Sequence, residues 1–287
     1  MMSDNLAVSE TERRAGRGLS ENLRSRLVWG TALAAVALAL TYAGPIPFAL
    51  FVLVVALFVS WEWGRMVRGV SADVAFFVQA IAVAAAVALT TAGYAALAVA
   101  VIVTAAIILI PLVFGRGARL SALGAFYVGL PSISLIWLRQ DAHYGLLAAL
   151  LIFAVVWSSD IAAYAAGRAI GGPKLWPRIS PNKTWAGLLG GATACVIAGA
   201  VFAGLIDASP LRLGLIALGL SLIAQAGDLG ESALKRLFGF KDASSLIPGH
   251  GGFMDRMDSI VAVAVAAGMI AFAINPHAPA QALLFGV

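Results

Sequence analysis

The sequence predicts an all-α polytopic membrane protein with about nine transmembrane helices and a cytoplasmic N-terminus. Of the 287 residues, 61% are hydrophobic and only 11% are charged, whereas a typical soluble domain has about 25% charged residues. So few charges could not cover the surface of a soluble globule, but lipid solvates an apolar exterior. Several apolar runs also approach the roughly 20 residues that cross a hydrocarbon core. The distribution of basic residues is the third indication.

Glycine and proline divide the chain into apolar segments, with breaks at Pro45, Gly93, the Gly115–Gly117 turn and Pro210. The N-terminus does not resemble a cleaved signal peptide, because the first apolar run begins only near Leu27, after a long polar stretch. That run is therefore predicted to be a retained membrane helix. The expected helices cover residues 27–43, 46–63, 73–92, 94–114, 119–138, 145–167, 185–206, 211–237 and 257–275.

Basic residues alternate between successive connections in the way this division requires. With the N-terminus inside, all 19 Lys and Arg residues except Arg139 and Arg212 fall in inside segments, as the rule for short loops predicts. The net charge of +5 is thereby assigned to membrane orientation, and no nucleic-acid partner is expected. The predicted organisation is a disordered cytoplasmic tail at 1–22, helices 1–5 in 23–144, helices 6–9 in 145–275 with cytoplasmic loops at 168–185 and 235–256, and a C-terminal tail at 276–287.

Several acidic residues fall inside or at the ends of the later apolar segments, where charge is expensive and usually functional. Asp160 lies in the sixth segment, Asp228 and Glu231 lie in the eighth, and Asp255 and Asp258 open the ninth. Glu62 stands among Trp61, Trp63 and Arg65, and this setting predicts an interfacial anchor without a catalytic role.

The spacing of these acids predicts a carboxylate cluster. Asp228, Glu231 and Lys235 follow an i, i+3, i+7 pattern on one helix face, and Asp255 and Asp258 are also three residues apart. Facing each other, the acids would need a neutralising cation or proton, and hard oxygen ligands favour Mg²⁺ over zinc. A purely structural alternative is that they pair with Lys235, Arg236 and Arg256 to hold helices together.

Two basic loops could bind phosphate groups. The loop at 235–256 offers Lys235, Arg236, Lys241 and His250, and Gly251–Gly252 lead into the ninth helix. A phosphate at that helix start would meet free backbone N–H groups and the helix dipole. The alternative is a solvated basic loop held by anionic lipid.

The loop at 168–185 also contains residues that could bind a phosphate group, at the start of the seventh helix. Thr184 or Ser180 is expected to cap that helix, and Lys183 would meet an anion at its start. The single Cys195 lies in an apolar run and is expected to be a packed small hydrophobe.

The segment from Ser232 to Asp258 resembles the signature of the phosphatidate cytidylyltransferase family. The matching positions are Ser232, Leu234, Lys235, Arg236, Lys241, Asp242, Ser244 and the run from Ile247 to Asp258 except Met254. Earlier flanks agree at Asp160, Ala163, Tyr164, Gly167 and Arg168, and at Ser180, Pro181, Lys183, Thr184 and Trp185. One departure is Ala186, where family members commonly carry Glu or Gln.

The resemblance implies Mg²⁺-dependent transfer of CMP from CTP to phosphatidic acid, with a second cation compatible with the number of acids. It implies a multi-pass protein of a bacterial-type inner membrane whose site faces the cytoplasm, and a homodimer is compatible with such a bundle. The resemblance implies catalytic roles for Asp228, Asp255, Lys235 and Arg256, and metal binding by Asp228, Asp255, Asp258 and Glu231. It implies substrate binding by Ser180, Lys183, Thr184, Arg236, Lys241, His250, Gly251 and Gly252. Supporting roles are implied for Asp160, Tyr164, Ser232 and Asp242.

Three other functions stay open at this stage. A secondary transporter would explain intramembrane acids and glycine-broken helices, although the motifs here gather at one face. A CTP-dependent lipid kinase or a phosphotransferase acting on a CDP-alcohol would share the chemistry of the site, and product analysis separates them. A structural membrane scaffold would leave the charged residues unexplained.

Overall fold

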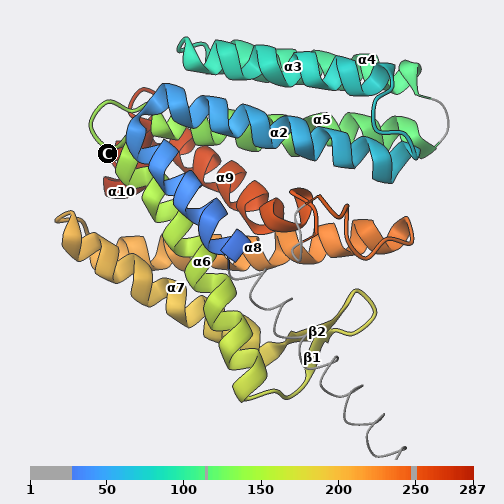
Figure 1. Cartoon of the computed structure of the whole chain (residues 1–287). Helices are drawn as coiled ribbons and strands as arrows, with labels where there is room; N and C mark the ends of the chain where they lie inside the picture. Colours follow the sequence, from blue (N-terminus) through green and yellow to red (C-terminus); the bar gives the residue numbers. More distant parts are fainter. Residues whose placement is uncertain (1–27, 114–115, 247–250) are drawn as a thin grey trace, which may run out of the picture.

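The computed structural model describes residues 28–113, 116–246 and 251–287. The predicted tail at 1–22 and His250 lie outside the described residues. Within them the chain is almost entirely helical (Figure 1). The helices are α1 (Val28–Ala43), α2 (Pro45–Arg68), α3 (Val74–Thr91), α4 (Ala95–Leu112), α5 (Arg116–Arg139), α6 (Gly145–Ala169), α7 (Trp185–Leu205), α8 (Pro210–Leu237), α9 (Met254–Ile274) and α10 (Pro279–Phe285).

This architecture confirms the predicted fold class. In the described part of the chain, eight helices, α2 to α9, are long and apolar enough to cross a membrane, and α1 is a shorter apolar helix that borders the undescribed residues 1–27. Large apolar side chains such as Leu50, Ile81, Ile107 and Val201 are exposed on the outside of the bundle. Because lipid solvates such a surface, the chain is a multi-pass membrane protein.

Local sequence signals explain where the helices begin and end. Pro45 and Pro210 occupy the first turns of α2 and α8, where a missing N–H costs nothing. Gly69 ends α2 with a positive φ of 75°, a conformation that glycine adopts without strain. The side chains of Asp73 and Thr184 cap α3 and α7 by accepting hydrogen bonds from backbone N–H groups.

The helices form two packed groups that share α9. One apolar core lies among α2, α3, α4 and α5 and extends to Met254 at the start of α9. The second lies among α6, α7, α8, α9 and α10. Figure 1 shows α9 running between α2 and α5 on one side and α8 on the other. The two halves of the chain therefore meet along α9, from Met254 in its first turn to Gly268 and Phe272 further along the helix.

Two short elements were not expected. The loop after α6 contains an antiparallel hairpin of β1 (Lys174–Trp176) and β2 (Ser180–Thr184). The C-terminal segment expected as a tail contains α10, whose Leu283 and Leu284 are fully buried in the second core.

Cys195 is also fully buried in the second core, as expected for a packed small side chain.

Candidate active site

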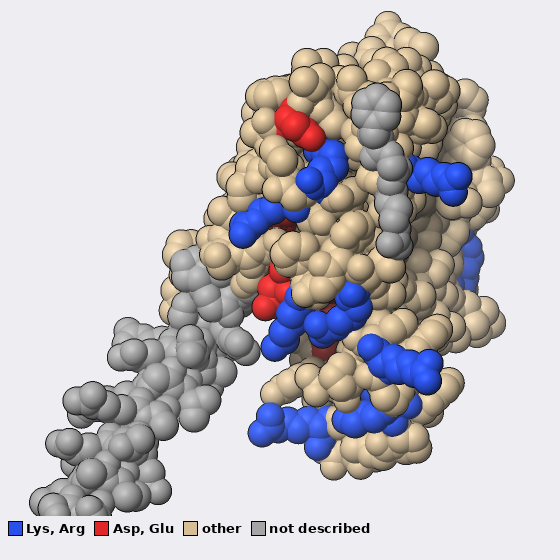
Figure 2. All heavy atoms as spheres, turned by 90° about the vertical axis from the view of Figure 1, so that its right-hand side faces the viewer, with Lys and Arg blue, Asp and Glu red and all other residues tan. Residues whose placement is uncertain are grey.

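Basic residues gather at one end of the helix bundle. This end holds the C-terminal ends of α2, α6 and α8, the N-terminal ends of α7 and α9, and the β1–β2 hairpin. Figure 2 shows Lys and Arg side chains spread across this face, with acidic side chains visible between them. Of the basic side chains that the structure describes, Arg139 and Arg212 lie instead at the ends of α5 and α8 that face α10 or α1.

A cavity of about 930 Å³ opens at this basic end. The helices α6, α7, α8 and α9 and the hairpin supply its walls, so both loops singled out from the sequence border it. Its polar and charged lining consists of Asp160, Tyr164, Arg168, Lys174, Asn182, Lys183, Thr184, Gln225, Asp228, Asp255, Arg256, Asp258 and Ser259. A cavity of this volume is within the range of small-molecule sites.

Acidic residues from three helices converge on the cavity. Asp160 comes from α6, Asp228 from α8 and Asp258 from α9. Asp258 is close enough to Asp228, Glu231 and Asp160 to interact with all three electrostatically. The predicted meeting of acids from the eighth and ninth segments is therefore present. As arranged, no group of three or more His, Cys, Asp or Glu residues in the described ranges is placed to hold a metal ion by itself.

Lys183 connects the hairpin to this acidic wall. Its Nζ lies 2.6 Å from Oδ2 of Asp228 and 3.4 Å from the backbone oxygen of Gln225. Ser232 donates a 3.4 Å hydrogen bond to the other oxygen of Asp228. Both partners of the ion pair are partly exposed, at 22% and 28%, so an anion or cation entering the cavity could reach either charge.

Lys235 forms a second and more deeply buried ion-pair group. Its Nζ lies 3.1 Å from Oε1 of Glu231 and 2.7 Å from Oδ1 of Asp255. Tyr127 of α5 donates a 2.5 Å hydrogen bond to Oε2 of Glu231. Glu231 therefore faces α5 and Lys235, and it does not line the cavity. For this residue the geometry agrees with the structural alternative of helix-to-helix pairing.

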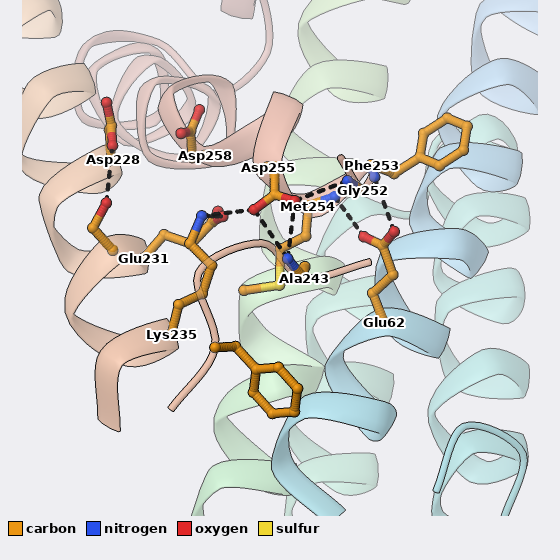
Figure 3. A network of polar contacts seen from close by, with 12 residues as sticks. Glu62, Asp228, Glu231, Lys235, Ala243, Gly252, Phe253, Met254, Asp255 and Asp258 are labelled. Atoms are coloured by element: carbon orange, nitrogen blue, oxygen red, sulfur yellow. Dashed lines mark hydrogen bonds and ion pairs between the residues drawn. The ribbon is translucent and has the colours of Figure 1, made fainter. Parts of the chain in front are cut away.

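Asp255 is fixed by backbone groups as well as by Lys235. Its Oδ2 accepts hydrogen bonds from the N–H groups of Ala243 and Gly252, at 2.9 and 2.8 Å. It thus stabilises the N-terminus of its own helix α9, and it still borders the cavity. Figure 3 shows these bonds beside Asp228 and Asp258.

The prediction that Glu62 is an interfacial anchor is wrong. Glu62 is fully buried. Its carboxylate accepts hydrogen bonds from the N–H groups of Phe253 and Met254, at 3.0 and 2.7 Å, and from the hydroxyl of Ser244. The neighbouring tryptophans indicated an interface, but only the tertiary fold brings the end of α2 to the start of α9. An acidic residue in an apolar helix was the one available signal.

The remaining predicted residues divide between the cavity and its surroundings. Thr184 lines the cavity, and its hydroxyl accepts a 3.0 Å hydrogen bond from the N–H of Gly187. Tyr164 lines it and accepts a hydrogen bond from Arg168. The lining does not include the following predicted residues: Ser180, Ser232, Arg236, Lys241, Asp242, Gly251 and Gly252.

Sequence reasoning gave no specific role to several lining residues. Arg168 was noted as a loop charge and as a position of the family resemblance, and Lys174 was counted only as a loop charge. No role was assigned to Asn182, Gln225 or Ser259. The sequence could have indicated Gln225 because it lies one helical turn from Asp228 on α8. It could have indicated Ser259 because it directly follows Asp258 on α9.

Fold and site together define a membrane-embedded protein with a polar cavity suited to phosphate-bearing ligands. Comparison with known proteins narrows this class. Residues 24–274 match the Cytidylyltransferase family. A phosphatidate cytidylyltransferase of Brucella suis biovar 1 (strain 1330) is 42% identical over 248 residues, which are 85% of this chain and 91% of the relative. The enzyme of the same name from Bacillus subtilis (strain 168) is 42% identical over 144 residues, 49% of this chain and 53% of the relative.

The chain therefore belongs to the cytidylyltransferase family of enzymes. The resemblance to phosphatidate cytidylyltransferases inferred from the residues between Asp160 and Asp258 is confirmed. The Brucella match extends well beyond those residues and includes much of the N-terminal helices.

Proposed function

We propose that this chain transfers CMP from CTP to phosphatidic acid, giving CDP-diacylglycerol and pyrophosphate for phospholipid synthesis. The observation that carries the proposal is the cavity at the basic end of the bundle, where acids of α6, α8 and α9 face basic residues of α6 and the hairpin. The names of the relatives from Brucella and Bacillus support it. A site at the end of membrane helices can receive a lipid from the bilayer and a nucleotide from water.

In this reaction an oxygen of the lipid phosphate forms a bond to the α-phosphorus of CTP. The bond from that phosphorus to the oxygen bridging the β-phosphate breaks, and pyrophosphate leaves with the electron pair. Because the nucleophile is already an anion, no strong general base is needed. The protein must instead hold two anions together and stabilise the charge that develops on transfer.

Basic residues that line the cavity perform this task. Arg168, Lys174, Lys183 and Arg256 border the space that the phosphates would occupy. Lys183 now neutralises Asp228 at 2.6 Å, and we expect its ammonium group to turn to a phosphate oxygen when the substrate enters. Lys235 has a structural role instead, because its ammonium group is bound to Glu231 and Asp255 and is not available to a substrate phosphate.

The donor set of the cavity fits Mg²⁺. Asp228, Asp255 and Asp258 supply hard carboxylate oxygens at its wall, and Mg²⁺ usually takes one or two carboxylates together with substrate phosphates and water. When bound, the ion would neutralise phosphate charge and polarise the α-phosphate. Glu231 is omitted from this set because it does not border the cavity; its two oxygens instead bind Tyr127 and Lys235.

We further propose that the basic end faces the cytoplasm of a bacterial inner membrane. The gathering of Lys and Arg at that end supports this orientation, which would also give the cavity access to cytosolic CTP. A homodimer remains a prediction.

The test uses purified protein in detergent with CTP, phosphatidic acid and Mg²⁺. Lipid-linked CMP and pyrophosphate are measured with and without EDTA. The expected result is equal release of both products, stopped by EDTA and restored by excess Mg²⁺. Formation of CDP and a phosphorylated lipid would instead identify a lipid kinase, and absence of any product from folded protein with several phosphatidic acids would refute the proposal.

A matched pair of variants makes the assay specific for the cavity. Asp228→Asn removes a carboxylate that lines it, whereas Asp207→Asn removes an exposed carboxylate from the turn between α7 and α8. Asn tolerates the positive φ of 55° at position 207. Only Asp228→Asn should lose activity.

A further inference from the structure

We propose that Glu62 is a positioning residue for this reaction: it fixes the N-terminus of α9, and through it the places of Asp255 and Asp258 in the cavity. The inference rests on the proposed function. Glu62 lies on α2 and does not border the cavity, whose described lining begins only at Trp157. It would therefore act through the backbone that it binds.

Among the described residues, the hydrogen bonds of Glu62 go to the segment that leads into α9. One carboxylate oxygen, Oε1, accepts from the N–H of Phe253 and from the hydroxyl of Ser244. The other, Oε2, accepts from the N–H of Met254, the residue immediately before Asp255. The first N–H groups of a helix have no partner within the helix, and a negative charge is stabilised at this end of the helix dipole.

Aromatic packing strengthens the same connection. The rings of Phe58 on α2 and Phe253 are stacked with centroids 4.7 Å apart. Met254 is fully buried in the core formed by α2 to α5. A polar and an apolar contact thus tie one backbone segment to α2.

The carboxylates of Glu62 and Asp255 lie close to the two glycines that precede α9, Gly251 and Gly252. The N–H of Gly252 donates to Asp255, and a Cβ added at Gly252 would collide with the carboxylate of Glu62. Gly251 has a φ of 88°, and a Cβ there would come within 2.8 Å of Oδ2 of Asp255. Figure 3 shows Gly252 between Glu62 and Asp255. This arrangement explains the need for glycine here without any direct contact with phosphate.

The test compares Glu62→Ala with Glu62→Gln and with Ser60→Ala. Ser60 is a matched control, because it is fully buried on the same helix and accepts a hydrogen bond from Gln79, away from α9. Loss of a partner that orients metal ligands typically costs about 10–100-fold in metal affinity or activity. Glu62→Ala should therefore lower kcat and raise the Mg²⁺ concentration for half-maximal activity within that range. The KM for phosphatidic acid should change little.

Glu62→Gln should show an intermediate loss, because an amide keeps one acceptor oxygen but loses the charge. Ser60→Ala should match the wild type in kcat and Mg²⁺ requirement. If Glu62→Ala is folded and has wild-type kcat and Mg²⁺ requirement, the proposal is overturned. If Glu62→Ala fails to fold, Ser244→Ala takes its place against Ser60→Ala, with the same two kinetic readouts deciding.

Amide hydrogen exchange provides a readout that does not depend on activity. Exchange at residues 251–257 should be faster in Glu62→Ala, or in Ser244→Ala, than in wild type and Ser60→Ala. Unchanged exchange there would overturn the proposal even if turnover fell. If the wild-type protein makes no CDP-lipid, the proposed function fails, and the exchange result still decides whether Glu62 holds the start of α9.

Discussion

Replacement of Lys235 by methionine should destabilise the fold. The ammonium group is the shared partner of two carboxylates, 3.1 Å from Glu231 and 2.7 Å from Asp255. All three side chains are buried, with exposed fractions of 11%, 1% and 6%. Methionine preserves most of the apolar stem, so the substitution mainly removes the charge.

The expected magnitude follows from burial. Removing one partner of a buried ion pair costs about 3–5 kcal/mol, because a charge is left without compensation. Here two carboxylates lose the same cation, although Tyr127 and the N–H groups of Ala243 and Gly252 continue to bind them. Since 1 kcal/mol shifts the unfolding midpoint of a large domain by about 2–4 °C, the expected decrease is on the order of 10 °C.

Tryptophan fluorescence during heating in detergent measures this midpoint. Lys241→Met serves as the control, because Lys241 is exposed. The double variant Glu231→Gln/Lys235→Met should recover part of the loss, since only one buried carboxylate then lacks its cation. A midpoint of Lys235→Met within about 2 °C of the wild type would refute the reasoning, because it would mean that the carboxylates need no buried cation.

Three further predictions follow from single contacts. Asp228→Asn should reduce CDP-lipid formation by more than the roughly 10–100-fold that loss of an outer-sphere partner costs, with an unchanged unfolding midpoint. Thr184→Ala should cost about 1 kcal/mol in a thermal unfolding assay, because the hydrogen bond from the N–H of Gly187 is lost, whereas Thr184→Ser should not. Although burial alone raises the pKa of Asp73, hydrogen bonds from Arg68 and the N–H of Phe76 lower it below 3.8. The stability that this carboxylate contributes is thus present above pH 3.8 and lost as pH falls through the lower pKa of the folded state, so the midpoint difference between wild type and Asp73→Asn should vanish in strong acid.

Apolar length and glycine or proline breaks predicted most helices to within a few residues. The segment expected at 185–206 is α7 (Trp185–Leu205), and that at 211–237 is α8 (Pro210–Leu237). The end of α2 was placed at residue 63, five residues before its observed end at Arg68. Hydropathy falls there, but the helix continues because Arg68 binds Asp73 and Ser121. Tertiary contacts of this kind produce no periodic pattern in the local sequence, so the end of α2 could not be predicted from it.

The site was predicted best for the acids whose helices end at the same side of the bundle. Asp160, Asp228 and Asp258 meet at the cavity because their helices pack together. Residues three apart on a helix nevertheless differ by about 60° in direction. That difference places Asp228 toward the cavity, whereas Glu231 turns to Tyr127. Spacing can therefore identify a polar helix face, but the partner helix determines which of its acids reaches the ligand.

The N-terminal helices contribute to the site through buried carboxylates rather than through its lining. Tyr127 of α5 holds Glu231, and Glu62 of α2 holds the start of α9. These pairs lie 104 and 192 residues apart in sequence, so no local pattern links them. A buried carboxylate without such partners would be costly, and each interaction therefore also fixes how the two helix groups pack. On the proposal that Glu62 fixes the start of α9, the positions of Asp255 and Asp258 depend on α2 as well as on their own helix.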